Sequence, residues 1–180
     1  FCQKAAERAD VFCNEEWCMV PLSIQLRSAI LGRKPADELA NQLQQLLLSR
    51  RFHTHSKAQA DSALLLYWQT TKNYLTIDEW LQHNPLTEHD AQRLPEFMQR
   101  LNVYRALLCR EQPSLQTDQL NALYRDIQRT QALQFHYLNA QLCLLAFIVE
   151  QRQNKQPNLE QIEKSLSQFS QFNALSFCLE

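Results

Sequence analysis

The sequence contains a single glycine, Gly32, among 180 residues. Tight β-hairpins, phosphate-binding loops and nucleotide-binding folds all depend on backbone conformations that glycine adopts most easily. The scarcity of glycine therefore argues against these three classes. Leu, Gln, Ala, Glu and Arg dominate instead, and these good helix formers place their apolar members at helical spacing. We predict an all-α protein with short connections.

The sequence also lacks an excess of charge of one sign and lacks long apolar runs. Eighteen basic and nineteen acidic residues are mixed along the chain, with a formal net charge of -1. No basic surface is predicted, so we do not expect nucleic acid as a partner. The apolar runs at 63–68 and 142–149 are far shorter than the ~20 residues of a membrane-spanning helix. Any membrane anchoring would need a segment absent from this chain.

Start and stop signals divide the chain into about seven or eight helices. Its length and 45% hydrophobic content suit one compact domain that buries roughly 70% of its unfolded surface. The longest stretch without proline or glycine, residues 117–152, carries apolar residues at spacings of three and four. We predict that residues 1–180 form a single-domain helical bundle around one long central helix over 117–152.

Local signals predict where the shorter helices begin and end. Gly32 is expected to be the left-handed residue that ends a helix. Ser56 or Thr54 is expected to cap a later one. Thr76 is followed three positions later by Glu79, which is the pattern of a capping box. A first helix over 3–14 and a last helix after residue 158 complete the predicted bundle.

The cysteine count bears on the compartment. Six cysteines is a high and even number, which favours an oxidising compartment over the cytosol, where thiols are kept reduced. The chain begins with Phe1 rather than Met, as expected if a targeting or anchoring segment precedes it. We therefore expect an extracytoplasmic protein, in a compartment such as the periplasm.

Four cysteines are disulfide candidates: Cys2, Cys13, Cys18 and Cys178. Cys2 and Cys13 lie ~16 Å apart along a continuous helix, whereas a disulfide needs Cα atoms within ~7 Å. Cys13 with Cys18 is the favoured pair, and Cys178 with Cys18 or Cys2 is the alternative. The other two cysteines are predicted to be buried thiols that act as small apolar side chains.

No catalytic or metal-binding constellation is completed by the sequence. A nucleophile such as Cys13, Cys18 or Ser56 would need a histidine base and an orienting acid, and no histidine falls in a recognisable motif. A zinc site from the two cysteines with His53 and His55 would lack the close C-x2-C spacing of most structural sites. We predict no catalytic residue, no metal and no cofactor, with a thiol- or histidine-dependent enzyme as the lesser alternative.

The function predicted from these features is binding. Helical proteins without glycine loops or charge fields most often act as interaction modules. We therefore predict a non-enzymatic adaptor, assembly or pilot-type protein that binds a partner protein. Its binding surface would be an exposed apolar groove whose anchors are Trp17, Trp80 and Leu81.

A sensory ligand-binding domain of a membrane-anchored receptor or regulator is the alternative. Its small-molecule ligand would occupy a cavity between helices, the usual site in a bundle. Aromatic residues at helical spacing can equally fill a core, so this lining is a hypothesis. The predicted lining residues are Trp68, Tyr104, Tyr124 and His136.

The disulfide hypothesis has a direct test. Alkylation without reductant of protein purified from its native compartment, followed by mass spectrometry, should show fewer than six modified cysteines, because a disulfide protects two. Six modified cysteines would contradict both the disulfide and the extracytoplasmic location that depends on it.

Overall fold

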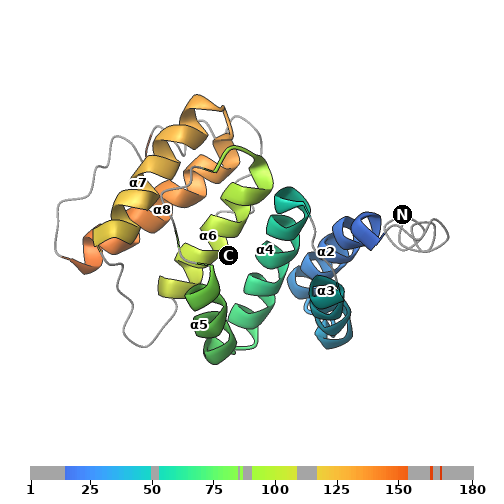
Figure 1. The fold of residues 1–180 in the computed structure, drawn as a ribbon. Helices are drawn as coiled ribbons and strands as arrows, with labels where there is room; N and C mark the ends of the chain where they lie inside the picture. Colours follow the sequence, from blue (N-terminus) through green and yellow to red (C-terminus); the bar gives the residue numbers. More distant parts are fainter. Residues whose placement is uncertain are drawn as a thin grey trace.

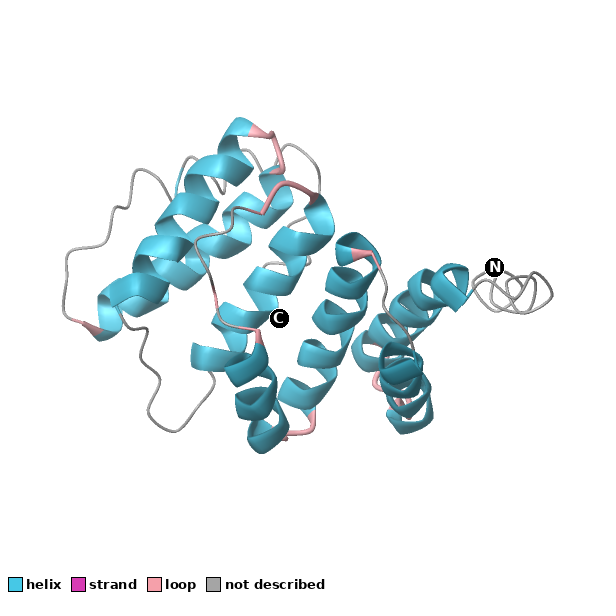
Figure 2. Ribbon diagram, in the orientation of Figure 1, coloured by secondary structure: helices cyan, strands magenta, loops and turns pink. Residues whose placement is uncertain are grey.

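The structure, a computed structural model, describes residues 15–49, 53–84, 86, 91–108, 117–153, 163 and 167. Within these ranges every regular element is an α-helix and no strand occurs, which confirms the all-α prediction (Figure 2). The predicted helix over 3–14 lies outside the described residues. Of the predicted last helix only residues 163 and 167 are described, and both are helical and exposed.

Seven helices make up the described fold, and two of them form its centre (Figure 1). They are α2 (Glu15–Leu31), α3 (Asp37–Ser49), α4 (Thr54–Thr70), α5 (Tyr74–His83), α6 (Leu94–Leu108), α7 (Thr117–Ala132) and α8 (His136–Arg152). Helices α4 and α6 pack against each other in the middle. Helices α2 and α3 cover the other side of α4, α5 packs on α4, and α7 and α8 cover α6.

The predicted central helix over 117–152 is wrong, because the chain turns back on itself between α7 and α8. Gln134 adopts a left-handed conformation with a φ of 58°. Its N–H donates to the carbonyl of Gln131 at 3.1 Å, and the N–H of Phe135 donates to that of Thr130 at 2.9 Å. These two bonds form a Schellman motif, which usually has glycine at the left-handed position. The absence of glycine and proline from residues 117–152 therefore does not mean that they form one continuous helix.

Two more helices end in the same way. Arg33 follows α2 with a φ of 51°, and Lys72 follows α4 with a φ of 57°. In both cases the N–H of the next residue donates to the carbonyl five positions earlier at 2.8 Å. Gly32 does not have a positive φ, so the helix ends where predicted but the left-handed residue is its neighbour. A non-glycine residue bears the conformational cost at each of the three turns.

The helix starts also differ in detail from the predicted caps. Asn73 is the N-cap of α5, and its side-chain oxygen accepts a hydrogen bond from the N–H of Thr76 at 3.4 Å. The helix therefore begins before the predicted capping box. Helix α4 begins at Thr54 with His53 as N-cap, and the His53 side chain makes no capping hydrogen bond. Ser56 lies buried in its first turn rather than before it.

One hydrophobic core contains buried residues from all seven helices. Its centre is formed by α4 and α6, which pack against each other and between them contact the other five described helices. Helix α6 has one apolar face, whose residues follow the spacing of three and four positions that is typical of a buried helix face. This face consists of Phe97, Leu101, Tyr104 and Leu108, all buried.

The left-handed turn at Gln134 predicts a stabilising substitution. Gln134→Gly should raise the free energy of unfolding by about 0.5–1 kcal/mol, because glycine removes the steric cost of a positive φ. Gln128→Gly is the matched control, since this exposed residue lies inside α7 and the change should lower stability by about 1 kcal/mol. Urea unfolding measures both. A destabilising effect at both positions would show that residue 134 is helical and that 117–152 is continuous.

Candidate functional site

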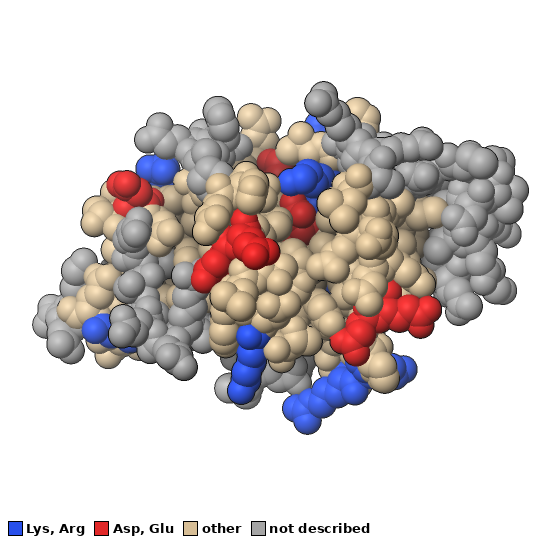
Figure 3. Space-filling view, turned by 60° about the horizontal axis from the view of Figure 1, so that its bottom comes forward, with Lys and Arg blue, Asp and Glu red and all other residues tan. Residues whose placement is uncertain are grey.

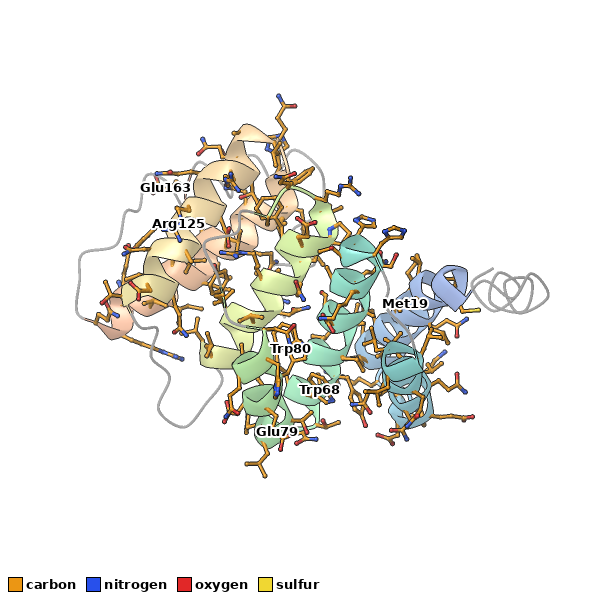
Figure 4. All side chains as sticks on the ribbon, in the orientation of Figure 1. Met19, Trp68, Glu79, Trp80, Arg125 and Glu163 are labelled. Carbon is orange, nitrogen blue, oxygen red and sulfur yellow. The ribbon has the colours of Figure 1, made fainter. Side chains whose placement is uncertain are left out.

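A cleft of about 470 Å³ lies among α4, α5, α6 and the described residues 86, 91 and 92 that precede α6. Its apolar lining is formed by Ala58, Trp80, Leu86, Ala91 and Val103. Its polar lining is formed by Thr54, Lys57, Asp61, Asn84, Gln92, Glu96, Gln99 and Arg100. In Figure 4, the labelled Trp80 lies on α5 beside α4 and α6. The cleft is thus lined by five apolar residues and by eight polar ones, four of which are charged.

Helical periodicity explains how these side chains meet. The lining residues of α4 lie at positions 54, 57, 58 and 61, and those of α6 at 96, 99, 100 and 103. Spacings of three and four place side chains on one face of a helix. Each helix therefore turns one mixed face toward the cleft and another toward the core.

Asp61 forms the floor of the cleft and is only 2% exposed. One carboxylate oxygen accepts hydrogen bonds from Lys57 Nζ at 3.2 Å and Gln99 Nε2 at 3.0 Å, and the other accepts from Trp80 Nε1 at 3.3 Å. The donors come from α4, α5 and α6. Burial raises the pKa of Asp61, and the charge of Lys57 and the three hydrogen bonds oppose that effect. One carboxylate therefore connects all three helices of the cleft.

Lys57 lies at the mouth of the cleft, with 47% of its side chain exposed. Besides its ion pair with Asp61, its ammonium donates a hydrogen bond to Asn84 Oδ1 at 3.0 Å. An ammonium group has three N–H donors, so these two bonds leave one for a ligand. Asn84 is itself held by a hydrogen bond from its Nδ2 to the carbonyl of Trp80 at 2.9 Å.

Glu96 is the second acid of the cleft and lies in the first turn of α6. Its Oε2 accepts hydrogen bonds from the backbone N–H of Gln92 at 2.7 Å and of Arg93 at 3.3 Å. This caps the helix and fixes the carboxylate. Within the described part of the chain, Oε1 accepts no hydrogen bond. One acceptor oxygen of Glu96 is therefore available.

A second buried polar cluster lies behind the cleft, between α6 and α7. Arg100 Nε donates to Asp126 Oδ2 at 2.5 Å, and Tyr104 OH donates to the same oxygen at 2.7 Å. Arg100 also donates from Nη2 to the Tyr104 hydroxyl at 3.2 Å. Burial and the charge of Asp126 raise the pKa of Tyr104, so its hydroxyl stays protonated. This cluster orients Arg100, which lines the cleft.

The four residues predicted to line a ligand cavity do not line this cleft. Trp68 is 5% exposed and Tyr104 is fully buried, and both belong to the core. The Tyr124 hydroxyl donates to Glu150, and burial raises its pKa to about 12. His136 is the first residue of α8 and is partly exposed. The structure brings Trp68 and Tyr104 into one core, and none of the four residues belongs to the cleft.

Of the three predicted anchors for a partner protein, Trp80 lines the cleft. Leu81 is partly buried against the core. Trp17 lies in α2, and its side chain is outside the described part of the structure. Among the described side chains, the most exposed large apolar ones are Leu48 on α3 and Leu75 on α5. Of the predicted site residues whose side chains the structure describes, Trp80 alone lines the cleft.

Sequence reasoning missed the four charged residues of the cleft, which are Lys57, Asp61, Glu96 and Arg100. None of them stands in a motif, and charged residues on a helix usually face solvent. Lys57 and Asp61 are spaced by four positions on one helix, which is the sole local signal of their ion pair. The contributions of α5 and α6 are not visible without the tertiary structure.

Two of the six cysteines, Cys18 and Cys143, are described, and both are buried. Burial of Cys143 confirms its predicted role as a core residue. Among the described residues there is no disulfide, and Cys2, Cys13, Cys109 and Cys178 lie outside them. Disulfide formation therefore stays a prediction.

The described helices show two further absences. None of them is both long enough and apolar enough to cross a membrane. No group of three or more His, Cys, Asp and Glu side chains in the described ranges lies close enough to hold a metal ion. Figure 3 shows acidic and basic side chains interspersed on one face of the molecule.

Comparison with known proteins gives no assignment, since no family model, no curated protein and no solved structure matches the chain. Function has to be inferred from the chemistry of the site, because a helical bundle supports many different functions.

Burial of Asp61 predicts a pH-dependent difference between the protein and its Asp61→Asn variant. The folded-state pKa is raised above the unfolded value of about 3.9, so the folded protein holds this proton to higher pH. The free energy of unfolding of the protein minus that of the variant should therefore be highest near pH 4. This difference should fall as the pH rises through the folded-state pKa of Asp61. Urea unfolding of both proteins between pH 4 and 8 measures the difference. A relative stability that rises over this interval would show that the pKa is lowered instead.

Proposed function

We propose that the protein is a non-enzymatic ligand-binding domain and that the cleft among α4, α5 and α6 is its binding site. The proposal keeps the sensory alternative derived from the sequence but moves the site. Trp80, rather than the core residues Trp68 and Tyr104, provides the aromatic wall.

The size of the cleft is the observation that carries this proposal. A volume of about 470 Å³ falls in the range of about 300–1,000 Å³ that is typical of small-molecule sites. A stable protein–protein interface buries about 800 Å² on each partner, which needs a broad surface rather than one recess. A small ligand suits the cleft better than a folded partner.

The hydrogen bonding in the cleft favours binding over catalysis. Both carboxylate oxygens of Asp61 already accept hydrogen bonds from protein groups, whereas a general base must face the proton it removes. The polar groups are held in place before a ligand arrives, which lowers the entropic cost of binding. A preorganised recess with apolar walls is what a binding site requires.

An adaptor that binds a partner protein is the second candidate, and the position of Trp80 favours it. A tryptophan that lines a recess can anchor an apolar side chain from an extended partner segment. In either case the site is the same cleft, so one experiment addresses both candidates. An extracytoplasmic location is part of the proposal and depends on the disulfide test.

Nuclear magnetic resonance of the indole N–H groups tests the proposed site. The chain has three tryptophans, and a Trp80→Phe variant identifies the Trp80 signal by its loss. Titration with a panel of amino acids, organic acids, amines, sugars and short peptides should shift this signal, because its N–H lies in the floor of the cleft. The signal of Trp68, which is 5% exposed in the core, serves as the internal control.

Two results would contradict the proposal. One is that no compound of the panel shifts the Trp80 signal at millimolar concentration. The other is that compounds bind but perturb only backbone amides outside the cleft. Shifts caused by peptides of several residues but not by small molecules would favour the adaptor over the sensory domain.

A further inference from the structure

We infer that the ligand of the cleft is a zwitterion of the amino-acid type, with an apolar side chain. Its carboxylate would accept a hydrogen bond from Lys57 Nζ, and its ammonium would donate to Glu96 Oε1. This inference rests on the proposed function, since it names the ligand class of the same cleft.

The first observation is the spare donor on Lys57. Its ammonium engages Asp61 and Asn84, and these two acceptors hold it at the mouth of the cleft. The third N–H is available on a side chain that is 47% exposed. A ligand carboxylate there would form a charge-assisted hydrogen bond without a rearrangement of the protein.

The second observation is the spare acceptor on Glu96. Two backbone N–H groups hold Oε2, so the carboxylate cannot turn away from the cleft without losing both bonds. No ion pair joins Glu96 to a cation within the described part of the chain. An ammonium group of the ligand would supply that missing positive charge.

The balance of charge in the cleft supports a ligand with both signs. Lys57 is paired with Asp61, and Arg100 is paired with Asp126, so these four charges largely cancel. A purely anionic ligand would be repelled by Glu96, and a purely cationic one would leave the third N–H of Lys57 without an acceptor. A zwitterion satisfies both groups and adds no net charge to the recess.

The acid in the floor does not prevent this arrangement. Asp61 would repel a ligand carboxylate bound to Lys57, but its charge is balanced by the ion pair with Lys57, and both of its oxygens accept hydrogen bonds from protein donors. The remaining lining provides apolar contacts for a side chain, from Trp80, Leu86 and Val103. An aliphatic side chain is the simplest match to that surface.

Three related probes test the inference on the unmodified protein: L-leucine, N-acetyl-L-leucine and L-leucinamide. The second lacks the ammonium group and the third lacks the carboxylate. Titration of the Trp80 indole signal should show that each derivative binds about tenfold more weakly than L-leucine, because each loses one charge-assisted hydrogen bond.

Two variants assign the lost contacts to residues. Glu96→Gln should weaken the binding of L-leucine and L-leucinamide by about tenfold and should not weaken that of N-acetyl-L-leucine, which has no ammonium group. Lys57→Gln should weaken the binding of L-leucine and N-acetyl-L-leucine to a similar degree and should not weaken that of L-leucinamide, which has no carboxylate. Lys34→Gln and Glu79→Gln, which change exposed residues outside the cleft, are the matched controls.

The two proposals fail in distinguishable ways. If the titrations gave the same affinity for all three probes, the inference would be overturned and the cleft would remain a binding site. The same would follow if the only compounds that shift the Trp80 signal were not zwitterions. The absence of any shift across the whole panel would overturn the proposed function itself. If Lys57→Gln does not fold, the Glu96→Gln variant and the three probes still test the inference. Glu96→Gln is expected to fold, because the glutamine side-chain oxygen can accept the hydrogen bonds from the N–H groups of Gln92 and Arg93.

Discussion

The buried carboxylate of Asp61 is the interaction on which the cleft depends. Donors from α4, α5 and α6 converge on its two oxygens. Removing a single donor from a buried carboxylate costs about 1–3 kcal/mol. The three helices are therefore held in one arrangement by a requirement for hydrogen bonds, in addition to the apolar core. That requirement also directs the indole of Trp80 into the recess.

Helix α6 connects this site to the rest of the bundle. Its neighbouring residues Gln99 and Arg100 reach two different carboxylates, Asp61 on α4 and Asp126 on α7. Both carboxylates are nearly inaccessible to solvent. The polar networks on the two sides of α6 restrict its rotation about its own axis, because a rotation would break bonds on both sides. The cleft is thus a rigid recess, which suits selective binding of a small charged ligand.

Much of the fold could be predicted from the sequence because the signals are local. A chain with one glycine and mostly helix-forming residues forms helices, and the spacing of Phe97, Leu101 and Tyr104 correctly identified the buried face of α6. Helix ends were less accurate. Three helices end at a left-handed Arg, Lys or Gln, and packing of the following helix overrides the weak local preference for glycine at such positions.

The sequence by itself determined the helical class, and it contains no recognisable catalytic motif. Only the tertiary structure decided that residues 117–152 fold back at Gln134 and that α4 and α6 form the centre. It also decided the cleft, in which Lys57, Trp80 and Glu96 meet from three helices. Periodicity reports which face of a helix is apolar, but not which helices lie side by side. A site assembled across helices depends on that second choice, which long-range packing makes.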